Sequence, residues 1–110
     1  MQRNLVLPVV ASVLLFAGAF AGSAHAAGDA AQGHTLAKTW CSGCHAVEPG
    51  GVQRDAPAPP FSIIAAHDDQ RPERLRAFLT SPHPPMPNLN LSRSEIDDVI
   101  AYIQSLGARP

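Results

Sequence analysis

The chain has 110 residues, enough for one small domain, and 45% of them are hydrophobic. Eight basic residues stand against nine acidic ones, so the formal net charge at pH 7 is −1 with the histidines neutral. Neither charge forms a block, which argues against a nucleic-acid-binding surface and against a charged, disordered tail. Two cysteines leave open a disulfide, a zinc site, a redox dithiol and a haem attachment site.

The amino-terminal residues predict a secretory signal peptide. Arg3 supplies the positive start, an apolar run follows over residues 5–22, and Ala24 and Ala26 fit the small-x-small pattern of a cleavage site. An uncleaved membrane anchor is the alternative, but the run is slightly short of the roughly 20 apolar residues that a spanning helix needs. We therefore expect residues 1–26 to be removed on export to the periplasm, with no stable membrane insertion afterwards.

Cleavage leaves a predicted mature domain of residues 27–110. Without Arg3, seven basic residues remain against nine acidic ones. At this size a hydrophobic core alone is marginal, and a staple, a metal or a cofactor is often needed. Export also implies an oxidising compartment, in which the two cysteines can form a disulfide.

The first predicted helix begins at Asp29 and runs to about Trp40. Asp29 suits the N-cap, and Gln32 three residues later completes a capping-box pattern. Gly33 lies inside this helix, where a glycine costs about 1 kcal/mol relative to alanine. A second helix approaching closely at Gly33 would justify that cost, although simple tolerance of the glycine is an equal alternative.

The middle of the chain predicts loops around one clear helix. Residues 46–60 are rich in proline and glycine and form a loop, and residues 61–67 are apolar enough for one or two helical turns. Residues 71–81 form the second clear helix, with Pro72 in its first turn. Four prolines follow within residues 82–87, which predicts an extended, stiff loop that is neither helical nor a paired strand.

The last predicted helix has the clearest boundaries. Ser92 and Glu95 form a capping box, and Leu91 with Ile96 forms a hydrophobic staple. Gly107 marks the end. One apolar stripe runs along the helix, made of Ile96, Val99, Ile100, Ile103 and Leu106. No strand pattern is convincing, so the fold class is all-α, with three to four helices and long loops.

The stretch CSGCH carries the chemistry. Cys41 and Cys44 are three residues apart, so on one helical turn both sulfurs lie on the same side, and His45 follows directly. This is the attachment pattern for a c-type haem, in which two thioethers hold the porphyrin and the imidazole binds the iron. We therefore expect one covalently bound haem c, held by Cys41, Cys44 and His45, with His45 as an iron ligand.

Other uses of the two cysteines fit less well. A structural zinc site wants four ligands, and the remaining histidines form no second pair at metal-binding spacing. A thioredoxin-type dithiol needs a strand before its helix, and no sheet is predicted. A disulfide between the two cysteines would close only a tiny loop and would leave His45 without a role.

The second axial position of the iron has three candidates. Met86 lies between two prolines in a loop where nothing else demands a long thioether, and such a loop can present the sulfur at a fixed position. A soft sulfur suits iron and raises the reduction potential relative to a second histidine. Met86 is therefore favoured as distal ligand, with His83 next and His67 last. His34 and His67 are expected to be ordinary surface histidines.

With these motifs, the mature chain resembles small bacterial monohaem cytochromes c of class I. The resemblance is carried by CSGCH, by PPMPNL and by the closing helix SEIDDVIAYIQSL, and it covers nearly the whole mature chain. It implies a small cytochrome c fold wrapped around the haem. It also implies that the first and last helices cross where a glycine meets an aromatic residue, a role that Gly33 and Tyr102 match.

The resemblance also implies roles around the haem. A proline carbonyl should accept the second N–H of His45; Pro59 and Pro60 are the candidates, and Pro60 is favoured. Trp40 is expected on or near the haem, with a general core role equally open. The propionates have Arg54, Arg71 and Trp40 as candidate partners. The apolar haem pocket is expected to include Phe61, Ile64, Phe78, Leu79, Leu89 and Ile100.

The expected function is one-electron transfer. A haem with both axial positions filled by protein has no open place for a substrate, so the chain is expected to be a carrier and no enzyme. Its partners are redox proteins that dock transiently, and the protein itself is expected to be a monomer. Two alternatives stay open: the dedicated cytochrome c subunit of a periplasmic dehydrogenase, and a haem sensor or peroxidase with a labile distal ligand.

Overall fold

Four helices and connecting loops make up the computed structural model, which describes residues 28–52, 58–81 and 83–107. The helices are α1 (Ala30–Trp40), α2 (Phe61–Ala66), α3 (Pro72–Thr80) and α4 (Arg93–Gly107). Within these ranges there is no strand, only an isolated bridge between His83 and Met86. The all-α prediction is confirmed. The predicted signal peptide, residues 1–26, lies outside the described residues.

The first helix is capped from two sides. The Asp29 carboxylate accepts the backbone N–H groups of Ala31 at 2.8 Å and of Gln32 at 3.1 Å, as predicted for an N-cap. The reciprocal half of the expected capping box comes from elsewhere, because the N–H of Asp29 donates to Asp98 Oδ1 at 2.7 Å instead of to Gln32. Helix α4 therefore completes the cap of α1.

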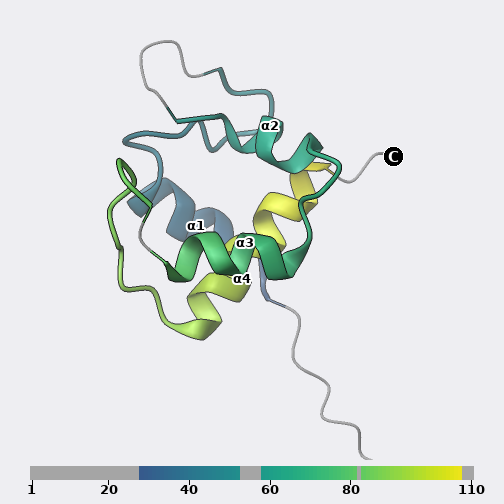
Figure 1. The fold of residues 1–110 in the computed structure, drawn as a ribbon. Coiled ribbons are helices and arrows are strands. Elements are labelled where there is room, and N and C mark those ends of the chain that lie inside the picture. Colours follow the sequence, from purple (N-terminus) through teal and green to yellow (C-terminus); the bar gives the residue numbers. More distant parts are fainter. Residues whose placement is uncertain (1–27, 53–57, 82, 108–110) are drawn as a thin grey trace, which may run out of the picture.

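Helices α1 and α4 form the most extensive contact between helices of the described residues (Figure 1), and they cross at Gly33. A Cβ atom on Gly33 would overlap the backbone carbonyl of Asp98 and would lie 2.9 Å from Tyr102 Cβ. Only glycine allows this approach of the two backbones. The expected meeting of Gly33 with Tyr102 is confirmed, and the cost of a mid-helix glycine is offset by the packing that it permits.

The boundaries of α4 follow the sequence signals. The N–H of Ser92 donates to Glu95 Oε2 at 2.7 Å, and the N–H of Glu95 donates to Ser92 Oγ at 3.3 Å, so the capping box is complete. The hydrogen bond from the Ser92 backbone holds the pKa of Glu95 below its usual value. At the other end, Gly107 lies so close to Ala65 that a Cβ would be 2.6 Å from its carbonyl oxygen.

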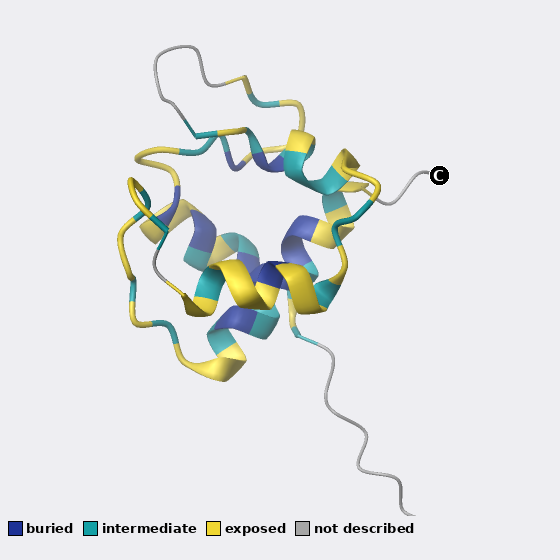
Figure 2. Cartoon of the chain, in the orientation of Figure 1, coloured by how far each residue is buried: buried dark blue, intermediate teal, exposed yellow. Residues whose placement is uncertain are grey.

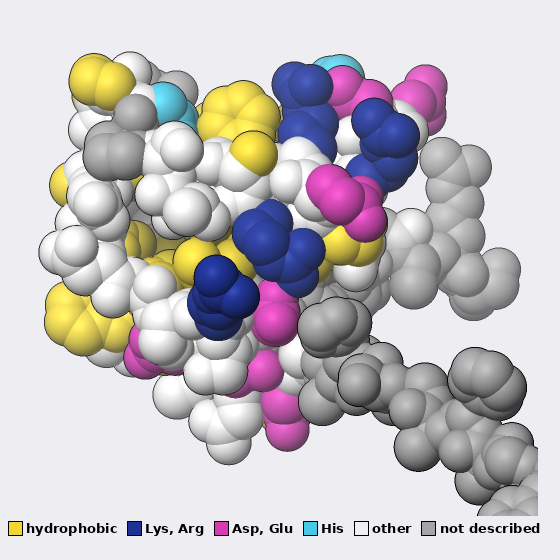
Figure 3. Space-filling view, turned by 60° about the horizontal axis from the view of Figure 1, so that its bottom comes forward, with side chains coloured by type: hydrophobic (Ala, Val, Ile, Leu, Met, Phe, Trp, Pro, Cys, Tyr) yellow, Lys and Arg dark blue, Asp and Glu magenta, His cyan; other side chains and the backbone are white. Residues whose placement is uncertain are grey.

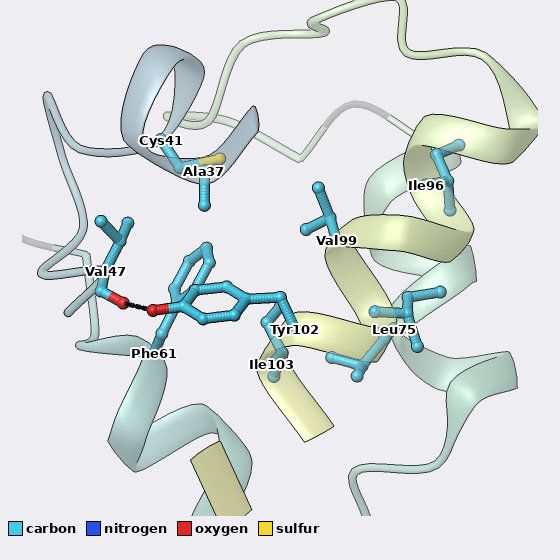
Figure 4. Packing of buried hydrophobic residues seen from close by; sticks show 10 residues of the cluster. Ala37, Cys41, Val47, Phe61, Leu75, Ile96, Val99, Tyr102 and Ile103 are labelled. Carbon is cyan, nitrogen blue, oxygen red and sulfur yellow. Dashed lines mark hydrogen bonds between the residues drawn. The ribbon is translucent and has the colours of Figure 1, made fainter. Parts of the chain in front are cut away.

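A single hydrophobic core lies between the helices (Figures 2 and 4). Helix α4 supplies half of it, α1 contributes Ala37, α2 contributes Phe61 and α3 contributes Leu75. Phe78 of α3, expected in the apolar haem pocket, is 45% exposed, and the Arg74 guanidinium lies over its ring at 5.4 Å. None of the helices in the described ranges is long and apolar enough to cross a membrane.

Candidate haem-attachment site

The two cysteines and the histidine occupy a tight turn at the end of α1. Cys41 is the C-cap of the helix, and its carbonyl accepts the N–H groups of Cys44 at 3.1 Å and of His45 at 2.9 Å. These bonds add one more turn after α1, as the three-residue spacing predicts. Cys41 is buried and Cys44 is exposed, and the two are not joined by a disulfide.

The surroundings of Cys41 favour a neutral sulfur over a thiolate. Burial raises the pKa of the Cys41 thiol to about 11, because removal from water disfavours the charged form. A zinc site needs thiolates, whereas a thioether carries no charge and tolerates an apolar environment. Among the described residues, no group of three or more His, Cys, Asp or Glu side chains could hold a metal ion.

The His45 ring is held by the loop that precedes α2. Its Nδ1 donates to the carbonyl of Pro59 at 2.7 Å, which leaves Nε2 with its lone pair free. The prediction of Pro60 for this role was wrong. The Pro60 carbonyl instead accepts the N–H groups of Ile63 and Ile64 at 3.0 and 3.1 Å, because it begins α2. The carbonyl one residue earlier is therefore the one available to the histidine.

Neighbouring contacts lock this arrangement. The N–H of Phe61 donates to the carbonyl of Ala46 at 2.9 Å, so the segment after His45 is tied to the start of α2. The Phe61 ring lies 5.2 Å from the His45 ring, centroid to centroid, and behind it Tyr102 donates its hydroxyl to the buried carbonyl of Val47 at 2.6 Å (Figure 4). These contacts hold the imidazole in one orientation through its Nδ1 hydrogen bond and its packing on Phe61.

The proline-rich segment forms a tight turn, where an extended loop without strand pairing was expected. His83 and Met86 pair as an isolated antiparallel bridge, and the N–H of Met86 donates to the carbonyl of His83 at 2.9 Å. The peptide bond between Pro84 and Pro85 is cis. The prolines do exclude a helix, as predicted. His83, Met86 and Leu89 are half-buried, while the other described residues of 84–90 are exposed.

These segments line a cavity of about 270 Å³ that opens to the surface. Trp40, Cys41, Cys44 and His45 line it from the attachment turn, and Pro59 lines it from the loop before α2. The proline-rich turn lines it with His83, Met86 and Leu89. Figure 1 shows this turn, in green, on the same side of the molecule as the end of α1. Both cysteines, the imidazole and the thioether therefore face one largely apolar space.

Comparison with known proteins agrees with this geometry. Residues 28–103 match the family described as cytochrome c oxidase, cbb3-type, subunit III. The chain belongs to this cytochrome c family. It is also similar to cytochrome c-552 of Bradyrhizobium diazoefficiens, with 44% identity over 93 residues that cover 84% of this chain and 89% of the relative. No solved structure matches significantly. The protein is accordingly a monohaem cytochrome c, an electron carrier, and its family implies covalent haem c.

The residues of this cytochrome c fit such a group. The cavity is lined mainly by apolar side chains, as a porphyrin requires, and its polar atoms are few and chemically suited to iron or to thioether formation. Nε2 of His45 and the sulfur of Met86 are the kinds of donor that bind haem iron. Cys41, Cys44, His45 and Met86, the residues that the sequence predicts to hold the haem, all line this cavity.

Other predicted residues take different places in the cytochrome c. Trp40 lines the cavity and is 59% exposed, so the alternative core role is excluded. Pro60 is not among the lining residues, and neither is Arg71; Arg54 lies outside the described residues. Of the expected apolar pocket, only Leu89 lines this cavity. The others lie in the core or in a small hollow beside Met86, namely Phe61, Ile64, Ile100, Phe78 and Leu79.

One group of supporting residues was missed by the sequence reasoning. His34, expected on the surface, stacks on the Tyr102 ring with centroids 4.7 Å apart, and its Nε2 pairs with Glu48 Oε1 at 2.9 Å. Burial, and next the charge of Glu48, raises the pKa of Tyr102. The helical positions of His34 and Tyr102 beside the Gly33 crossing could have indicated that the two rings stack. Nothing in the sequence indicates that the loop after the attachment turn brings Glu48 next to them.

Proposed function

We propose that this cytochrome c is a periplasmic one-electron carrier whose single haem has His45 and Met86 as axial ligands. One observation carries the proposal: the free Nε2 side of His45, the sulfur of Met86 and both cysteines share a single apolar cavity. Cys41 and Cys44 would hold the group covalently. When bound, haem supplies a one-electron ferric/ferrous couple.

The chain's own residues tune that couple and close the site. The Pro59 carbonyl orients His45 and fixes the proton on Nδ1 through the hydrogen bond. The thioether of Met86 favours the reduced state relative to a second imidazole. The apolar lining keeps water away from both ligands, which limits the rearrangement that accompanies electron transfer. A site closed on both faces suits a carrier and disfavours substrate binding.

The periplasmic location rests on the sequence of residues 1–26. Arg3, the apolar run and the small residues at Ala24 and Ala26 have the order of a cleaved secretory signal. Edman sequencing of the exported protein would test the cut, which we expect near Ala26 or Ala27.

The partners are expected to be redox proteins that dock briefly. Such encounters bury less than about 1,200 Å². Basic and acidic side chains are interspersed on the face in Figure 3, and this mixture suits modest electrostatic steering. The relative named cytochrome c-552 is matched over 89% of its length, which supports a free carrier. The family name, subunit III of a cbb3-type oxidase, supports a second candidate: a subunit of a respiratory complex.

Two measurements on the purified holoprotein test the proposal. The ferric protein should show the weak far-red absorption band of iron–methionine ligation, and the ferrous protein should not bind carbon monoxide at neutral pH. A missing band together with ready carbon monoxide binding would instead support a sensor or peroxidase. Purification from native cells distinguishes a free carrier from a subunit. A free carrier should elute as a monomer from the periplasmic fraction, whereas a subunit should co-purify with an oxidase or a dehydrogenase.

A further inference from the structure

Two iron-binding side chains stand side by side in the proline-rich turn. His83 and Met86 are partners in an antiparallel bridge, closed by the Met86 N–H to His83 carbonyl bond of 2.9 Å. Residues paired in this way project their side chains to the same side, with Cβ atoms about 5 Å apart. Both side chains are half-buried and both line the haem cavity. The intervening Pro84 and Pro85 are exposed.

The imidazole of His83 is held in a state that can bind a metal. Its Nδ1 lies 3.2 Å from the carbonyl of Ser81, and since a carbonyl only accepts, Nδ1 carries the proton. In the neutral ring Nε2 then keeps its lone pair, as it does in neutral His45. The ring also rests edge-on against Phe78, with centroids 4.9 Å apart and planes at 86°. Two contacts therefore fix a ring that the proposed carrier function does not use.

The other histidines of the described ranges lack this placement. His34 pairs with Glu48 and stacks on Tyr102, and His67 pairs through Nδ1 with Asp69 at the surface. Neither lines the haem cavity. His83 is thus the one described histidine besides His45 that does.

We propose that His83 is a reserve distal ligand, which binds the haem iron through Nε2 whenever the thioether of Met86 leaves it. The exchange breaks an iron–sulfur bond and forms an iron–nitrogen bond; no electron or proton is transferred. The inference rests on the proposed function, because it takes Met86 as the resident ligand. Its consequence is that the iron stays closed to outside ligands and stays an electron carrier, at a lower potential, after the sulfur is lost.

The test compares two holoproteins that lack Met86, one that retains His83 and one in which His83 is also replaced. Met86→Ala should give a ferric protein that is still low-spin, with the spectrum of two nitrogen ligands. In Met86→Ala combined with His83→Phe, the new phenylalanine keeps a ring against Phe78 but offers no nitrogen ligand. The ferric iron of this double variant should become high-spin. Met86→Ala combined with His67→Phe is the matched control and should stay low-spin, since His67 is exposed and does not line the cavity.

Added imidazole gives a quantitative readout. A protein ligand that must be displaced lowers the apparent affinity, so the His83→Phe double variant should bind imidazole at least about tenfold more tightly than Met86→Ala alone. Equal affinities, or a high-spin Met86→Ala protein, would overturn the proposal. The pair Met86→Leu and Met86→Leu/His83→Phe repeats the comparison with the apolar volume retained, and circular dichroism verifies folding in each case.

The wild type separates this inference from the proposed function. The far-red band of iron–methionine ligation should be present in the wild type and should persist in the His83→Phe single variant. A wild type without the band, in which His83→Phe alone gives a high-spin iron, would make His83 the resident ligand and would refute both statements. A wild type with the band and a high-spin Met86→Ala protein would refute the reserve role alone.

Discussion

At the scale of single residues, the site is made by backbone carbonyls as much as by side chains. Pro59 orients His45, and Val47 receives the hydroxyl of Tyr102. Both carbonyls belong to the segments that follow the attachment turn or precede α2. By bonding to the Val47 carbonyl, Tyr102 therefore helps to hold the segment after His45, whose ring is expected to bind iron.

Tyr102→Phe tests this support. It keeps the ring but leaves the buried carbonyl of Val47 without its donor, which should cost about 1–3 kcal/mol of unfolding free energy. Denaturant unfolding of the holoprotein measures the loss. Ser105→Ala is a control on the same helix, because the hydroxyl of Ser105 bonds only to the Tyr102 carbonyl one turn earlier. A Tyr102→Phe protein as stable as wild type would contradict the role of this bond.

The same tyrosine gives stability a dependence on alkaline pH. Its pKa is raised in the folded protein, first by burial and then by Glu48, so the folded state holds the proton longer than the unfolded state. Stability is therefore fully present below the ordinary tyrosine pKa of about 10 and falls as pH rises above it. Tyr102→Phe should flatten this fall, which unfolding curves from pH 8 upward would reveal.

Sequence reasoning picked out four residues that the structure brings to one cavity, but it did not identify every hydrogen-bond partner. Cys41, Cys44, His45 and Met86 are set by local spacing and composition, so they could be predicted. The choice between Pro59 and Pro60 could not, because it depends on which carbonyl is consumed in starting α2. Proline content excluded a helix over residues 82–87 but did not distinguish an extended chain from a tight turn.

At the scale of elements, the helix signals were reliable where they are local. The capping box of Ser92 and Glu95 forms as predicted, and α3 begins with Pro72 in its first turn. The completion of the α1 cap by Asp98 was not readable, because it joins residues 69 positions apart. Long-range partners of this kind are decided by how α1 and α4 cross.

Gly33→Ala tests that crossing. The added methyl group would overlap the Asp98 carbonyl, and since that atom is backbone, the two helices must move apart. Overpacking of this kind costs about 1–3 kcal/mol, more than the helix propensity of alanine returns. Thermal unfolding should show a clearly lower melting temperature. Gln32→Ala, exposed on the same helix, is the control and should change stability by no more than about 0.5 kcal/mol.

At the scale of the whole molecule, the haem cavity lies between the attachment turn, the loop before α2 and the proline-rich turn. The protein core lies mainly around α4, so the loops on the cavity side have little apolar packing of their own. The all-α class and the long loops were evident from the missing strand pattern. The sequence did not predict that these loops line a common cavity, because their relative positions depend on the tertiary fold.

The cofactor is therefore expected to complete the core. A Cys41→Ser/Cys44→Ser double variant should be exported but largely unfolded, because a mature domain this small has a marginal core without haem. Circular dichroism and hydrogen exchange of the purified variant measure this. The serines differ from cysteine by one atom each, so the loss of attachment is the main change. A compact apoprotein that melts cooperatively would contradict the expectation.

The bond between the Asp29 N–H and Asp98 places the start of the folded domain within a few residues of the predicted processing site. Gly28 already packs on the backbone of Asp97, so a cut near Ala26 or Ala27 removes none of these contacts. An aminopeptidase that trims beyond Gly28 would take away the cap of the first helix and unfasten it from the last. A stable mature protein must therefore begin no later than Asp29. Chains trimmed further should be degraded and should be missing from the protein that accumulates in cells.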